Sequence, residues 1–385
     1  MKTIYLDHAA TSWPKPPEVL AAWNDYHQSV PGSPGRGAHR GSLEATKRVE
    51  NVRRELCQLL GGSDPRRLIF TSSCTHALNL GVFGFLKKGE HAIATGLDHN
   101  SVLRPLAAME ARGIIELTIV AGGREGFVKT EDVRAAIRSN TKLIAIPHAS
   151  NVIGTIQDVD AIVTLAHAAG IVVLLDAAQT AGIVPIDAKR SEMDMIAVPS
   201  HKSLLGPSGC GALLVRENVQ LEPCYFGGTG VESEKLTTGV SWPMSFEPGT
   251  ANPAGIVAWG AGIQYVGDFG PERILQNERE LAARLIEGFV AIPGVHLYGT
   301  TNIQKRVATI AISIDGVEAH EAAAILDTSF GILVRAGLIC AARLRESIGG
   351  PADGFIRFSL GYNTTKDDVD AAIHAVSEIA ASVNG

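Results

Sequence analysis

Short runs of Ile, Val and Leu alternate with helix-like segments between Arg67 and Val215, and this alternation is the strongest constraint on the fold. It is the pattern of repeated βαβ units, which build a largely parallel sheet. The pattern predicts an α/β fold whose larger domain holds a mostly parallel, seven-stranded sheet. The predicted strands cover residues 67–71, 91–95, 115–120, 143–147, 171–175, 195–198 and 211–215.

The rest of the chain points to a second, smaller domain. Residues 226–255 are rich in Gly, Ser, Thr and Pro, and we interpret them as a functional loop region that joins two domains. Helical patterns follow over 256–289, 319–329 and 366–383, and strand patterns over 306–314 and 355–360, which is typical of an α+β domain. A length of 385 residues also fits two domains better than one. We expect an N-terminal arm over 1–15 that packs with the small domain, a large domain over 16–255 and a small C-terminal domain over 256–385.

Four polar side chains each lie just past the end of a predicted strand. They are His99, Asn151, Asp176 and Lys202. Ligands of largely parallel sheets bind at the carboxyl ends of the strands, so these four side chains should meet in one crevice.

An acid after one strand and a lysine after the next suit pyridoxal phosphate. Lys202 would hold the aldehyde of the cofactor as a Schiff base, and Asp176 would keep the pyridine nitrogen protonated. Each residue alone has a plainer interpretation, Asp176 as a helix cap and Lys202 as a solvated loop residue. Their neighbours favour the cofactor, because Lys202 is followed by a turn containing Gly206 and Gly209 that lets backbone approach a ligand.

Further motifs suit the same cofactor. Residues 71–76 follow a strand and open a helix predicted over 77–86, and such a helix start favours a phosphate, with the Thr75 hydroxyl as an added donor. Ordinary capping by Ser or Thr is the alternative. His99 could lie flat on an aromatic ring and exchange protons, or be structural. Asn151 could donate to a phenolate oxygen, or be a turn residue, and Gln179 has the same ambiguity.

Two residues of the C-terminal part carry possible chemistry. Cys340 lies near a glycine turn, as either a nucleophile or a small buried apolar residue. Arg357 interrupts an apolar strand, where a guanidinium grips a planar anion such as a substrate carboxylate or forms a structural salt bridge.

Charge and cysteine usage exclude several classes of partner. A formal net charge of −6 without a long basic run argues against nucleic acid. The five cysteines are scattered and never spaced as metal ligands, so we expect neither a disulfide framework nor a metal site. Neither a signal peptide nor a membrane span is visible, and we expect a soluble, cytoplasmic protein.

Taken together, these motifs resemble the class V aminotransferase family of fold-type I pyridoxal phosphate enzymes, and within it the cysteine desulfurases and selenocysteine lyases. The resemblance spans nearly the whole chain. The motifs that carry it are Asp-His-Ala-Ala-Thr at 7–11, Ser-Asn-Val-Ile-Gly-Thr at 150–155, Asp-Ala-Ala-Gln at 176–179, His-Lys at 201–202 and Arg-Ala-Gly-x-x-Cys at 335–340.

The resemblance implies a role for each site residue. Lys202 binds the cofactor and removes the substrate α-proton, Asp176 pairs with the pyridine nitrogen, and His99 stacks on the ring. Arg357 binds the amino acid carboxylate, and Cys340 is the nucleophile that takes sulfur from L-cysteine as a persulfide and leaves L-alanine. Contacts to the phenolate oxygen come from Asn151 and Gln179, and phosphate contacts come from the Cys74 backbone, Thr75, His201 and, across a homodimer, Thr250.

The chain departs from the family pattern near the site. Pro199 stands where a serine is usual and His76 where glutamate is frequent, and Leu338 and Ile339 replace histidines before the cysteine. Arg335 is then a candidate cation for the thiol. The short cysteine loop resembles that of members that need a sulfur-acceptor protein.

Two alternatives remain at this point. One is a selenocysteine lyase or transaminase-like enzyme in which Cys340 is not the nucleophile, and the other is a scaffold that keeps the fold without chemistry.

Overall fold

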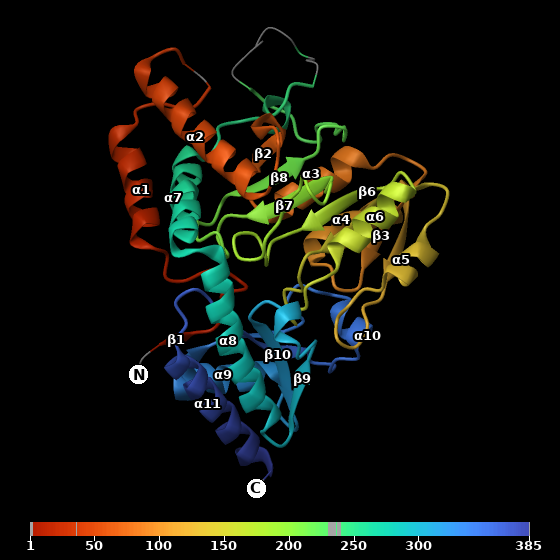
Figure 1. Cartoon of the computed structure of the whole chain (residues 1–385), viewed down its shortest axis with the longest axis vertical. Coiled ribbons are helices and arrows are strands. Elements are labelled where there is room, and N and C mark those ends of the chain that lie inside the picture. Colours follow the sequence, from red (N-terminus) through yellow and green to blue (C-terminus); the bar gives the residue numbers. More distant parts are fainter. Residues whose placement is uncertain (1–2, 36, 230–235, 237–239, 385) are drawn as a thin grey trace.

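The computed structural model describes residues 3–35, 37–229, 236 and 240–384. Its larger sheet has seven strands in the order β2-β8-β7-β6-β5-β3-β4 (Figure 1). All seven predicted strands are confirmed, with boundaries shifted by at most two residues. They are β2 (Leu68–Thr71), β3 (Glu90–Thr95), β4 (Ile115–Val120), β5 (Thr141–Pro147), β6 (Val172–Asp176), β7 (Met195–Pro199) and β8 (Gly211–Val215).

The sheet is mostly parallel, as predicted. Strands β4, β3, β5, β6 and β7 run parallel, whereas β8 is antiparallel to both of its neighbours, β7 and β2. The parallel strands therefore end at one edge, and the loops that follow β5, β6 and β7 meet there.

Helices cover both faces of this sheet. Val173 and Leu175 of β6 belong to an apolar cluster with α2 (Arg40–Leu59), α6 (Val159–Ala168) and α7 (Pro253–Phe269). Leu174, between them, points to the other face and packs with α3 (Cys74–Phe85) and α4 (Asn100–Ala111). Because successive side chains of a strand alternate between faces, burial on both sides explains the continuous apolar runs in the sequence.

The C-terminal part forms an α+β unit, seen at the bottom of Figure 1. Its antiparallel sheet has the order β12-β13-β10-β9 and packs against α8 and α11. The elements of this part are α8 (Pro271–Val290), β9 (Val295–Tyr298), η3 (Ile303–Lys305), β10 (Thr309–Ile314), α9 (Ala319–Phe330), β11 (Ile332–Leu333), β12 (Arg335–Gly337), α10 (Leu344–Ile348), β13 (Phe355–Ser359) and α11 (Lys366–Asn384).

Two predicted elements of this part need correction. The single helix predicted over 256–289 is two helices, because Gly270 has a φ of 91° and Pro271, which lacks an N–H, starts a new helix. The strand predicted from residue 306 begins at Thr309. Before it, the backbone pairs with a loop of the large half: Arg306 forms a bridge with Thr155, and Val307 N donates to the carbonyl oxygen of Gly154 at 2.9 Å. The buried Arg306 side chain adds donors to the carbonyl oxygens of Ile153 at 3.1 Å and Thr309 at 2.7 Å.

The first residues of the chain contact both halves of the molecule. Strand β1 (Ile4–Tyr5) pairs in parallel with β11, and Asp7 bridges to Ser359. A few residues later, Ser12 N donates to the carbonyl oxygen of His201 in the large half at 2.9 Å. The remaining helices of the large half are α1 (Pro17–Ser29), η1 (Pro65–Arg67), α5 (Thr130–Ala136) and η2 (Met244–Phe246).

The loop predicted over 226–255 falls partly outside the described residues, which omit 230–235 and 237–239. In its described part, η2 interrupts the loop and α7 begins at Pro253. None of the described helices is both long enough and apolar enough to cross a membrane.

Candidate active site

A cavity of about 200 Å³ opens at the carboxyl edge of the large sheet. The loops after the parallel strands form one wall, and residues of the C-terminal part form the other. All but one of the predicted site residues line it: Cys74, Thr75, His99, Asn151, Asp176, Gln179, His201, Lys202, Cys340 and Arg357.

Lys202 and Asp176 lie in this cavity because neighbouring strands end beside each other. Asp176 is the last residue of β6, and Lys202 follows β7. The Oδ1 atom of Asp176 accepts a hydrogen bond from Ala178 N at 2.9 Å, which fixes the carboxylate. Burial lowers the pKa of Lys202, and the Asp176 carboxylate opposes that shift. A lysine with a lowered pKa is more readily the free amine that attacks a carbonyl carbon.

The N-terminal arm holds the backbone next to Lys202. The carbonyl oxygen of His201 accepts from Ser12 N at 2.9 Å and from Lys15 Nζ at 2.8 Å. Burial lowers the pKa of Lys15 to about 8. The imidazole Nδ1 of His201 is buried and has no hydrogen-bond partner among the described residues, so this donor or acceptor is left for a ligand.

The phosphate end of the predicted site is the first turn of α3. This helix begins at Cys74 rather than at residue 77, because the Ser73 side chain caps it by accepting from His76 N at 3.2 Å. Thr75 therefore lies within the first turn, where free backbone N–H groups attract an anion. The Cys74 thiol contacts Asp176, with Sγ 3.9 Å from Oδ1, and burial raises the pKa of this thiol well above the ordinary value.

His99 caps α4 and is held by a residue that the sequence did not single out. Its Nδ1 atom accepts from Ser101 N at 3.0 Å and lies 2.8 Å from Ser101 Oγ. Ser101 Oγ is in turn 2.7 Å from Thr75 Oγ1. Burial lowers the pKa of His99. A serine two positions after a histidine at a helix start was the available signal for this contact.

Cys340 lies on a loop with unusual backbone geometry. Ile339 and Cys340 have φ values of 49° and 56°, a left-handed conformation that β-branched Ile339 rarely adopts. Asn151 Nδ2 donates to the carbonyl oxygen of Ile339 at 2.8 Å, and Asn100 N donates to that of Cys340 at 2.8 Å. The loop is thus fixed from both sides, which keeps the thiol in the cavity.

Arg335 lies beside the Cys340 thiol. Its Nη2 atom is 3.5 Å from Cys340 Sγ. The sequence predicted Arg335 as a candidate cation near the thiol, and in the structure the two side chains are in contact. The guanidinium is thus placed to donate to the sulfur atom.

Replacement of Arg335 by Gln should slow alkylation of Cys340 by iodoacetamide at neutral pH by about 3- to 10-fold, because a nearby charge is removed. Arg335→Lys keeps the charge, and its Cys340 should be alkylated at a rate between those of the wild type and Arg335→Gln. Peptide mass spectrometry would follow Cys340, with exposed Cys224 as the internal reference. Equal Cys340 rates in all three proteins would exclude a role for this cation.

Arg357 is buried, and two of its three guanidinium nitrogens have partners within the chain. It forms an ion pair with Asp7 through Nη2, and Nη1 donates to the carbonyl oxygen of Asn151 at 2.9 Å. Its Nε atom is buried without a hydrogen-bond partner among the described residues. The structural salt bridge anticipated as an alternative is therefore present, and the guanidinium still lines the cavity.

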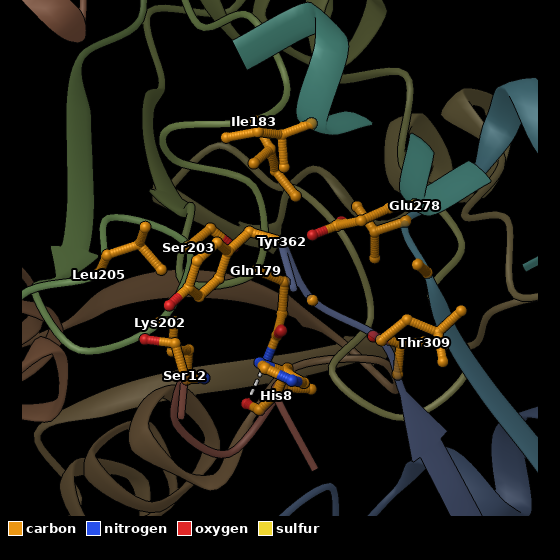
Figure 2. A pocket seen from close by; sticks show the side chains of 16 residues that line it. His8, Ser12, Gln179, Ile183, Lys202, Ser203, Leu205, Glu278, Thr309 and Tyr362 are labelled. Atoms are coloured by element: carbon orange, nitrogen blue, oxygen red, sulfur yellow. Dashed lines mark hydrogen bonds between the residues drawn. The ribbon is translucent and has the colours of Figure 1, made fainter. Parts of the chain in front are cut away.

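Gln179 connects this cavity with a second, smaller one. Its Nε2 atom donates to the carbonyl oxygen of Ala9 at 3.1 Å. The second cavity, of about 30 Å³, has room for about one or two water molecules. Figure 2 shows the Glu278 carboxyl group pointing into it, with Gln179 and His8 on the facing side. Burial raises the pKa of Glu278 from 4.5 to about 8.

Glu278→Gln should reduce the pH dependence of stability. Because the folded-state pKa lies above the unfolded value, the unfolded chain loses its proton first, and unfolding becomes easier as pH rises from 4.5 towards about 8. The loss should be on the order of a few kcal/mol, and the uncharged glutamine should remove it. Urea unfolding at pH 5 and pH 8 measures this. Glu280→Gln, on the exposed side of α8, is the matched control and should behave as the wild type.

Thr250 is the one predicted site residue that lies elsewhere. It lines a separate cavity with Thr71, Ser72 and His76. Within one chain it does not reach the Lys202 cavity, and a contact to the site of a second copy stays a prediction.

The side chains around the main cavity fit pyridoxal phosphate. A lysine amine and a fixed carboxylate face the same space, and the first turn of α3 offers N–H and hydroxyl donors for a phosphate. The unpartnered Nδ1 of His201 adds a buried polar atom in the same wall.

Comparisons with known proteins agree with this reading. The sequence pattern described as Aminotransferase class-V matches residues 4–372. A cysteine desulfurase of Cronobacter sakazakii is 32% identical over 384 residues, which cover 97% of this chain and 93% of the relative. A probable cysteine desulfurase of Halalkalibacterium halodurans is 34% identical over 376 residues, or 96% and 91% of the two chains. The apo structure of cysteine desulfurase from Thermococcus onnurineus NA1 has a TM-score of 0.93 and 30% identity, and covers 99% of this chain and 95% of that chain.

Proposed function

The chain belongs to the class-V aminotransferase family, among the cysteine desulfurases, and from that premise we propose that it converts L-cysteine to L-alanine and carries the sulfur away on Cys340. The observation that supports this most is the placement of Cys340. Its sulfur lies in the Lys202 cavity, next to the Arg335 guanidinium. A cysteine with only a structural role needs neither a place in this cavity nor a neighbouring guanidinium.

Pyridoxal phosphate, when bound, supplies an aldehyde for the substrate amine and a ring that accepts electrons from the substrate α-carbon. Lys202 would provide the amine that holds it, and Asp176 would pair with the pyridine nitrogen. His99 would stack on the ring, and Asn151 and Gln179 would contact the phenolate oxygen. The phosphate would be held by the Cys74 backbone, Thr75 and His201.

The substrate is positioned and deprotonated by residues of this cavity. Arg357 binds the carboxylate of the amino acid, and its unpartnered Nε is available for that contact. Lys202 Nζ then takes the proton from the substrate α-carbon. Burial lowers the pKa of Lys202 and so keeps a larger fraction as the free base.

Cys340 completes the reaction as a thiolate. A bond forms between Cys340 Sγ and the substrate sulfur, and the carbon–sulfur bond of the substrate breaks. The electron pair of the broken bond stays with the carbon fragment, which is protonated and leaves as alanine. Cys340 is left as a persulfide, which a thiol reductant or a sulfur-acceptor protein removes.

A homodimer is part of this proposal. Thr250 is exposed and lines a cavity together with Tyr225, which is 60% exposed, and the next residue along the chain, Phe226, is 80% exposed. Large exposed apolar side chains beside a cavity suit a protein partner. In a dimer, Thr250 would reach the phosphate site of the second copy. A cytoplasmic location also stays a prediction.

The test is to incubate the purified protein, supplied with pyridoxal phosphate, with L-cysteine and a thiol reductant. Alanine and sulfide should form in equal amounts. Parallel reactions with L-selenocysteine address the alternative substrate. Alanine from selenocysteine alone would replace the proposal by a selenocysteine lyase, and no product from either substrate, despite bound cofactor, would contradict it.

A further inference from the structure

Three side chains form a continuous hydrogen-bonded line from the predicted phosphate site to the ring-stacking histidine. Thr75 Oγ1 lies 2.7 Å from Ser101 Oγ, and Ser101 Oγ lies 2.8 Å from His99 Nδ1. Ser101 is buried, so water does not compete well for these contacts. None of the roles proposed above uses Ser101.

The donors and acceptors in this line can be assigned. Ser101 N donates to His99 Nδ1 at 3.0 Å, and a backbone N–H can only donate. His99 Nδ1 is therefore an acceptor, and the neutral ring carries its proton on Nε2. With Nδ1 as acceptor, the Ser101 hydroxyl has two possible directions, towards His99 or towards Thr75.

We propose that Ser101 is a positioning residue whose hydroxyl couples the His99 ring to occupancy of the phosphate site. This rests on the proposed function, because that function places a phosphate at Thr75. A phosphate accepts, so the Thr75 hydroxyl turns to donate to it. Thr75 Oγ1 then accepts from Ser101, and His99 Nδ1 keeps only the backbone N–H.

The coupling has a definite direction. Loss of the hydroxyl donor at Nδ1 removes one of the two contacts that favour the neutral ring, and the backbone N–H of Ser101 remains as the other. A filled phosphate site should therefore raise the pKa of His99. Asp176, Lys202, Arg335 and Arg104 also face this imidazole and act on it directly. These four charged side chains remain in a Ser101 variant, so such a variant removes only the hydroxyl that links Thr75 with His99.

The experiment compares pyridoxal phosphate with pyridoxal, which has the same ring without the phosphate. Nuclear magnetic resonance would follow the His99 ring as pH changes in the wild type and in Ser101→Ala. In the wild type we expect the Nε2–H tautomer and a higher titration midpoint with pyridoxal phosphate than with pyridoxal. In Ser101→Ala the difference between the two midpoints should shrink, because only the direct effect of the phosphate charge remains, and the preference for pyridoxal phosphate over pyridoxal should fall by about 3- to 10-fold.

Matched variants separate this role from a general packing effect. Ser42→Ala removes another buried hydroxyl, which donates to Ser33 O at 2.6 Å far from the cavity, and should leave both readouts unchanged. Ser101→Thr keeps the hydroxyl and should restore the difference. Where Ser101→Ala does not fold, Ser101→Cys gives the same comparison with a weaker donor.

The outcomes distinguish the two proposals. A midpoint difference of the same size in Ser101→Ala and in the wild type would overturn the coupling, even if the enzyme forms alanine from cysteine. A midpoint difference that is smaller without the hydroxyl, and is restored in Ser101→Thr, supports the coupling, even if no alanine forms and the proposed reaction is wrong.

Discussion

Cys340→Ala should lower alanine formation from L-cysteine by at least about 10³-fold, because it removes the atom that we propose takes the substrate sulfur. The affinity for pyridoxal phosphate should stay unchanged, since the cofactor contacts come from other residues. The experiment measures the rate of alanine release. It also measures persulfide on the protein, by mass spectrometry of the peptide that contains residue 340.

Cys224→Ala is the control for loss of a thiol, because Cys224 is exposed and does not line the cavity. It should keep the wild-type rate. Full alanine formation by Cys340→Ala would remove the persulfide from the reaction and favour elimination or transamination chemistry at the same cofactor.

Lys202→Ala should abolish the reaction, with a fall of about 10³-fold or more. In the proposed reaction the amine both holds the cofactor and moves the α-proton, and a positioned acid or base alone is worth about 10²–10⁴-fold. Unlike Cys340→Ala, this variant should also lose the covalent attachment of pyridoxal phosphate, which is measured by borohydride reduction and mass spectrometry.

Lys189→Ala is the control for the loss of a lysine charge, because Lys189 is an exposed lysine of the same half. It should retain both attachment and activity. Covalent labelling that persists in Lys202→Ala at another lysine, together with activity, would assign the anchoring role to that residue.

The strands of the large sheet were predictable because both faces are buried. A strand such as β8 is apolar and buried over its whole length, so it stands out without any knowledge of its neighbours. The direction of β8 was not predictable, since an apolar strand reads the same whether it runs parallel or antiparallel. The break at Gly270 was signalled by the Gly-Pro pair, but the apolar spacing continues across it.

Site residues that directly follow the end of a strand were predictable from the sequence. Contacts between loops that are distant in the sequence were not. Lys202 and Asp176 could be paired from topology alone. The contact between Asn151 and the carbonyl oxygen of Ile339 joins residues 188 positions apart, and no local pattern encodes it. Ser101 was missed because a serine in the first turn of a helix has a common capping explanation.

The ion pair between Asp7 and Arg357 spans 350 positions of the chain, which has a consequence during synthesis on the ribosome. The large sheet is complete once Val215 has emerged, but the arm that ties down the backbone beside Lys202 finds its other partner only when β13 is made. Domains fold in order as the chain appears, and distant contacts form late. The nascent protein should therefore acquire its sheet well before it can bind substrate, and ribosome-bound chains stalled before residue 357 should lack the amino acid site.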